Sequence, residues 1–191
     1  MSFFVTNLYV FILGVVLAIL EIQIEGKNGW AGKLPAWHPK GRSRLRSFFK
    51  VITNDREIDG YHLFLIILIA LFFHLPFVFG VPLIWESWIK IVSLFFLFVV
   101  FWDYLWFVFN PWFTVRKFKK TEVPWHKVWW LGIPADYWIG TVISFLFSTL
   151  GGWLTGDMGG FWSWWLASTI FIYALCMVVS GLSLMFVKER K

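Results

Sequence analysis

The chain has 191 residues, of which 59% are hydrophobic, 23% aromatic and only 15% charged. Because a soluble domain carries about 25% charged residues, this composition excludes an ordinary water-soluble protein and favours burial in a lipid bilayer. The formal net charge is +6, but the basic residues flank apolar segments and no known nucleic-acid-binding motif is present. We therefore expect anionic lipids of the inner leaflet, and no nucleic acid, as their partners.

Five apolar segments are near or above the length of about 18 to 20 residues that crosses the hydrocarbon core. In chain order they cover residues 3–20, 61–79, 84–109, 134–150 and 161–187. They predict an all-α fold, a polytopic bundle of five transmembrane helices in a single membrane domain, residues 1–191. Between the first two spans, residues 42–52 mix basic with apolar side chains, which is typical of an interfacial helix.

The basic residues predict the orientation of these spans. Eight lie in the loop 26–58, five in the connection 111–133 and three after the last span, and Lys90 is the one that remains of the seventeen. The positive-inside rule then places the N-terminus outside and the C-terminus inside. We expect a multi-pass integral membrane protein, in the inner or plasma membrane if the source is prokaryotic.

Acidic residues and histidines gather at the same predicted cytoplasmic boundary, where charge is costly and therefore informative. Glu21 and Glu25 follow the first span with i, i+4 spacing, which stacks both carboxylates on one helical face. Their repulsion favours a nearby cation, an arginine or a shared proton. Asp59 and His62 open the second span with i, i+3 spacing and offer one oxygen and one nitrogen ligand.

The third span adds a carboxylate and an amide on one face. Asp103 lies seven residues before Asn110, which places it roughly 10 Å deeper in the membrane, and Asn110-Pro111 ends the helix. His126 and Asp136 flank the start of the fourth span at the same boundary. Oxygen and imidazole ligands suit iron, manganese or zinc, and several carboxylates can hold a dinuclear centre. The predicted metal ligands are Glu21, Glu25, Asp59, His62, Asp103, Asn110 and His126.

Structural roles stay open for each of these residues. Glu21 and Glu25 could pair with lysines or arginines of the loop, and Asp59 could cap its helix. We favour a helix cap for Asp136 and an interface role for His126, whereas the depth of Asp103 favours a functional role.

Two segments resemble parts of other proteins. Glu25-Gly-Lys-Asn-Gly-Trp-Ala-Gly-Lys-Leu-Pro35 and Trp102-Asp-Tyr-Leu-Trp-Phe-Val-Phe-Asn-Pro111, with the patterns EGxxGWAxxLP and DxLWFVxNP, are similar to segments of uncharacterised small polytopic membrane proteins. The resemblance implies a membrane bundle and no named activity or residue role. It does mark the surroundings of Glu25 and Asp103 as distinctive.

The sequence therefore predicts a membrane metalloprotein with a carboxylate and histidine site at the cytoplasmic interface. An enzyme acting on a lipid or another amphiphile is one hypothesis, although no catalytic residue can be assigned and the reaction is not readable. The alternative is a non-enzymatic subunit or assembly partner of a larger membrane complex. The protein partner expected is another membrane protein or a second copy of the chain in a homo-oligomer. A transporter is disfavoured because the charged residues lie at one side and do not line a path across the bilayer.

Overall fold

The computed structural model describes residues 2–30, 33–38, 47, 50, 56 and 59–186. Within these ranges the long helices are α1 (Phe3–Glu25), α3 (Gly60–Val78), α4 (Trp85–Phe109), α5 (Ala135–Thr155) and α6 (Met158–Phe186). All five are long and apolar enough to cross a membrane. The predicted all-α bundle of five spans, and with it a multi-pass membrane protein, is confirmed.

The remaining described elements lie between α4 and α5. They are a 3-10 turn, η1 (Val115–Lys117), and the strand β1 (Trp129–Trp130), which pairs antiparallel with β2 (Ile133–Pro134). Most of the predicted interfacial helix 42–52 lies outside the described residues, although Ser47 and Lys50 are helical. The basic residues that follow Phe186 also lie outside them.

Helix α4 is the centre of the bundle. In its most apolar stretch of 18 residues, 61% of the residues are buried inside the protein, against 17% to 33% in the other long helices. Its side chains Phe98, Phe101 and Leu105 are completely buried. A Cβ atom on Gly14 of α1 would lie only 2.5 Å from the ring of Phe101, so the missing side chain lets α1 approach α4 closely. The outward faces carry apolar side chains such as those of Phe64 and Leu71, as lipid contact requires.

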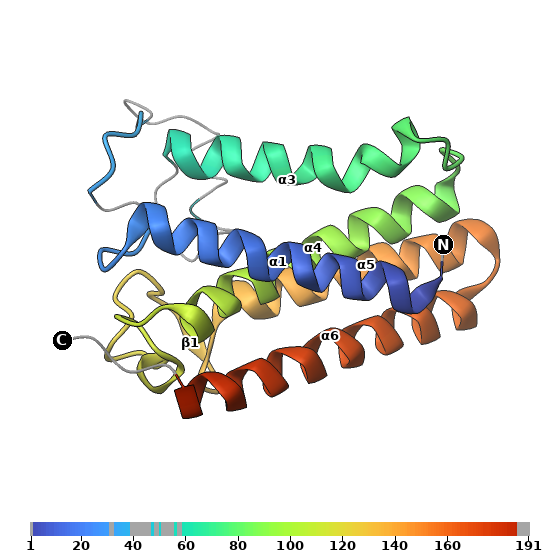
Figure 1. The fold of residues 1–191 in the computed structure, drawn as a ribbon. Coiled ribbons are helices and arrows are strands. Elements are labelled where there is room, and N and C mark those ends of the chain that lie inside the picture. Colours follow the sequence, from blue (N-terminus) through green and yellow to red (C-terminus); the bar gives the residue numbers. More distant parts are fainter. Residues whose placement is uncertain are drawn as a thin grey trace.

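The chain direction alternates from each long helix to the next (Figure 1). The last turns of α1, α4 and α6 and the first turns of α3 and α5 therefore share one end of the bundle, opposite the N-terminus of the chain. Helix α1 continues past residue 20 to Glu25, so both glutamates belong to its last two turns. The helix ends that carry the predicted ligands are thus brought to one level.

Candidate metal centre

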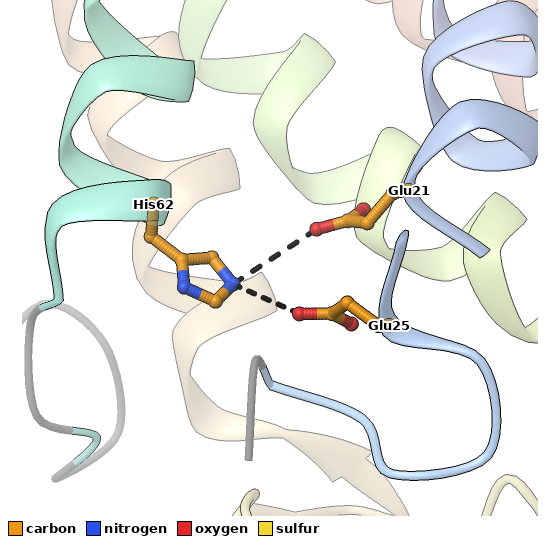
Figure 2. Close-up of side chains that lie close together, drawn as sticks. All are labelled: Glu21, Glu25 and His62. Carbon is orange, nitrogen blue, oxygen red and sulfur yellow. Dashed lines mark ion pairs between the residues drawn. The ribbon is translucent and has the colours of Figure 1, made fainter. Parts of the chain in front are cut away.

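Helix α1 supplies two buried carboxylates to this end of the bundle. Glu21 and Glu25 are 8% and 5% exposed, and their side chains point to the same side of the helix (Figure 2). The i, i+4 spacing places one above the other, as expected. Two carboxylates this close repel each other when both are ionised, so the pair is stabilised by a cation or a shared proton.

Helix α3 supplies an imidazole that is aimed at this pair. His62 Nε2 lies 3.5 Å from Glu25 Oε1 and 3.9 Å from Glu21 Oε1, and Figure 2 shows the ring pointing between them. The three ligand atoms lie within 4.8 Å of one another, a geometry in which they can hold one metal ion.

Asp59 sets the orientation of that imidazole. One carboxylate oxygen accepts a hydrogen bond from the His62 backbone N–H at 2.9 Å and so caps α3. The other lies 2.7 Å from His62 Nδ1, which leaves Nε2 free to face Glu21 and Glu25. Burial opposes ionisation of Asp59, but the hydrogen bonds from the His62 side chain and backbone, together with the charges of His62 and His38, outweigh it and lower the pKa of this carboxyl. A carboxylate behind a histidine is the usual outer partner of a metal-bound imidazole.

A small hollow of about 10 Å³ lies among these groups, which is about the space of one water molecule or one ion. The residues that line it come from the chain segments around α1, α3, α4 and the α4–α5 connection: Glu21, Glu25, Trp30, His62, Asp103, Trp106, Phe107 and Trp125. Three carboxylates and one imidazole therefore face a space that is otherwise lined by aromatic rings.

The turn after α1 covers the site with an indole. Gly26 and Gly29 have φ of 59° and 57°, values that glycine adopts without strain. A Cβ on Gly29 would lie 2.6 Å from the ring of Trp125, so any larger residue at this position would clash with that ring. The turn then places the ring of Trp30 parallel to the His62 ring, with 3.8 Å between the centroids.

A second cluster of charged groups adjoins the first. His126 lies between two carboxylates, with Nε2 3.3 Å from Asp103 Oδ2 and Nδ1 3.3 Å from Asp136 Oδ1. Arg56 donates to Asp136 and has its other nitrogen 3.6 Å from Asp103. The hydroxyl of Tyr137 donates to Asp103. This cluster joins the ends of α4 and α5 to the loop before α3.

His126 is 1% exposed, and burial alone would favour its neutral form. The contacts with Asp103 and Asp136 outweigh burial and raise the pKa of His126. In its protonated form the ring is a bridging cation between carboxylates from two helices. The guanidinium of Arg56, which also lies 4.0 Å over the ring of Trp30, connects the second cluster to the cover of the first.

The structure separates the predicted ligands into three groups. Glu21, Glu25 and His62 converge, and Asp59 supports them from behind. Asp103 lines the same hollow but is held in the second cluster together with His126. The side chain of Asn110 connects chain segments instead: Oδ1 accepts from the backbone N–H of Trp112 and of Phe113, and Nδ2 donates to the carbonyl of Gly26.

Three contributors were not identified from the sequence. Arg56 was one of eight basic residues in a loop, with no spacing that distinguished it. Trp30 was indistinguishable from the many tryptophans expected at membrane interfaces. Tyr137 follows Asp136 directly, and only its position in the first turn of a span pointed to this end of the bundle.

Comparisons with protein-family models, curated proteins and solved structures found no match for this chain.

Proposed function

We propose that this chain is an integral membrane metalloprotein in which Glu21, Glu25 and His62 bind a divalent transition-metal ion at the cytoplasmic boundary of the bilayer. The convergence of three buried ligand atoms within 4.8 Å, with the imidazole fixed by Asp59, is the observation that carries the proposal. The cytoplasmic assignment rests on the distribution of basic residues.

The ligand chemistry narrows the choice of ion. Two carboxylates and one imidazole suit zinc, iron and manganese better than a thiolate-preferring ion. Within the described ranges Glu21, Glu25 and His62 are the one group of three that meets the geometry, so we propose one ion and not two. Three protein ligands leave a coordination position open, which is characteristic of catalytic sites rather than structural ones.

An open position gives such a centre a chemical use. A metal ion polarises an oxygen-containing group or activates water there. Asp103 lines the same hollow, where its negative charge, held by Tyr137, His126 and Arg56, adds to the attraction for a cation. We therefore propose an enzyme that acts on a lipid or another amphiphile, since the site lies at the level where headgroups meet the bilayer.

The test is the metal content of protein purified without chelator. We expect about one ion per chain after supply of iron, manganese or zinc. Glu21→Gln, Glu25→Gln and His62→Gln should each lower this content strongly. Glu86→Gln is the matched control, because Glu86 is 53% exposed and pairs with Lys90 at the other end of α4.

A wild-type content far below one ion per chain, after all three metals have been supplied, would favour the non-enzymatic subunit. An equal loss in Glu25→Gln and Glu86→Gln would show that the bound metal lies elsewhere. Size-exclusion profiles of each variant establish that a lost ion does not reflect a lost fold.

A further inference from the structure

A cavity of about 360 Å³ adjoins the metal centre between α3, α4 and α5. Its polar end is formed by Glu21, Arg56, His62 and Asp103 among others, and Trp30 lies at the same level. Away from that end its wall is apolar, with side chains from all three helices: Ile66, Phe95, Phe96, Val99, Val100 and Ile143. The volume is in the range of sites that bind small molecules.

The depth of the cavity matches one leaflet of a membrane. Phe95 precedes Asp103 by eight residues of α4, so it lies roughly 12 Å deeper at 1.5 Å per residue. Ile143 follows Asp136 by seven residues of α5, which gives roughly 10 Å. Half of the hydrocarbon core is about 15 Å. Counted from Asp103 and Asp136, the cavity thus extends over most of the thickness of one leaflet's hydrocarbon.

The lining determines what kind of molecule fits. A polar solute would lose its hydration against the apolar wall with nothing to replace it, whereas a hydrocarbon chain gains from burial there. At the polar end Glu21 is a ligand of the proposed metal ion. Asp103 accepts a hydrogen bond from Tyr137 and contacts His126. The open position of the metal is left to receive an oxygen donor from the occupant.

Resting on the proposed metal centre, we infer that this cavity binds a single-chain amphiphile from the cytoplasmic leaflet, with an anionic carboxylate or phosphate head. The alkyl chain lies along the wall formed by α3, α4 and α5. The head brings to the metal ion a carboxylate or phosphate oxygen, a ligand that these metals accept. This assigns a substrate class to the site: a long-chain acyl compound that enters from the membrane and not from water.

The inference is tested by photo-crosslinking in lipid nanodiscs with a palmitate analogue that carries a diazirine in mid-chain. We expect the label on peptides that contain Val99 and Ile143. Unlabelled palmitate and lysophosphatidic acid distinguish a carboxylate from a phosphate head by which of them competes. Acetate and inorganic phosphate carry the same heads without a chain and should not compete.

Val99→Trp and Ile143→Trp fill the cavity from two different helices. Each should lower labelling roughly tenfold, equivalent to about 1.4 kcal/mol and to the exclusion of about two methylene groups, while the metal content stays that of the wild type. Ile170→Trp is the control, because Ile170 is 60% exposed on α6 and does not line the cavity.

Unchanged labelling in both filled variants, or label spread evenly over all outward faces, would overturn the acyl-chain site. Competition by acetate or inorganic phosphate, which have no alkyl chain, would show that the head suffices for binding and would overturn the acyl-chain site. If protein purified without chelator retains no metal but is still labelled at the cavity wall, the metal centre is refuted and the chain site is supported. Metal-loaded protein with no label at the wall refutes the chain site alone.

Discussion

Replacing Asp59 by asparagine separates the two roles of this residue. The side-chain oxygen of the new asparagine can still accept the hydrogen bond from the His62 backbone N–H, because asparagine caps helices about as well as aspartate. The second carboxylate oxygen of Asp59 accepts from His62 Nδ1 at 2.7 Å. In asparagine this position is taken by an amide N–H group, which can only donate to His62 Nδ1. The ring must then carry its proton on Nε2, the nitrogen that faces Glu21 and Glu25.

A proton on Nε2 blocks the lone pair that would bind the metal. Loss of an outer partner of a metal-bound histidine costs roughly 10- to 100-fold in affinity, equivalent to about 1.4 to 2.8 kcal/mol. The helix itself should be preserved, so the thermal unfolding temperature of metal-free protein should change little. The expected signature of Asp59→Asn is therefore weaker metal binding without a matching loss of fold.

Affinity is measured by titrating zinc against a fluorescent chelator that competes for the ion. Asp157→Asn provides the matched control, since Asp157 accepts from the backbone N–H of Gly160 at 2.9 Å at the other end of the bundle. It carries the same chemical change at a helix start with no histidine behind it. An affinity in Asp59→Asn within twofold of wild type, or an equal loss in Asp157→Asn, would refute the orienting role.

Three further outcomes follow from the same geometry. Asp103→Asn removes one of the three carboxylates that line the hollow and should weaken metal binding there roughly tenfold through the lost charge, and an unchanged affinity in the chelator titration would place Asp103 outside the centre. Because the pKa of His126 is raised from 6.5, its imidazolium stabilises the fold fully below pH 6.5, and this contribution is lost as pH rises through the raised value. The unfolding temperature should fall over that window, and less so in His126→Gln; parallel curves for the two proteins would contradict the bridging role. In intact cells an impermeant thiol reagent should label Asp157→Cys and spare Lys119→Cys, and the reverse pattern would move the site to the outer face.

The arrangement of the spans was predictable because it depends on local quantities. The length of each apolar run fixes whether it can cross the hydrocarbon, and the side of each loop stays a prediction from its lysines and arginines. Spacing also identified which residues share a face, as with Glu21 and Glu25. The first span was predicted to end at residue 20, whereas the helix continues to Glu25. The prediction ended the span where the apolar run ends, at Glu21, but a helix can continue past the apolar run with charged residues.

The convergence of particular ligands was not predictable, because it depends on how each helix is rotated about its axis. Seven candidates were placed at one level, and nothing in their spacing showed that His62 faces α1 while Asp103 is shared with His126. A helix cap and a place in the site were posed as alternatives for Asp59. The structure shows that one carboxylate does both, with one oxygen on the backbone and the other on the imidazole.

The two distinctive segments meet at the site, which gives a physical reason for their patterns. Glu25 ends α1 as a candidate ligand, and the glycines that follow it allow Trp30 to lie on His62. Asn110 then ties the end of α4 to the carbonyl of Gly26 at 3.3 Å. Insertion into a membrane requires only apolar length and places no demand on the spacing of glycines or on an asparagine. The glycines and the asparagine of these segments are therefore explained by local contacts at this end of the bundle, which hold Trp30 over His62 and the end of α4 against the turn after α1.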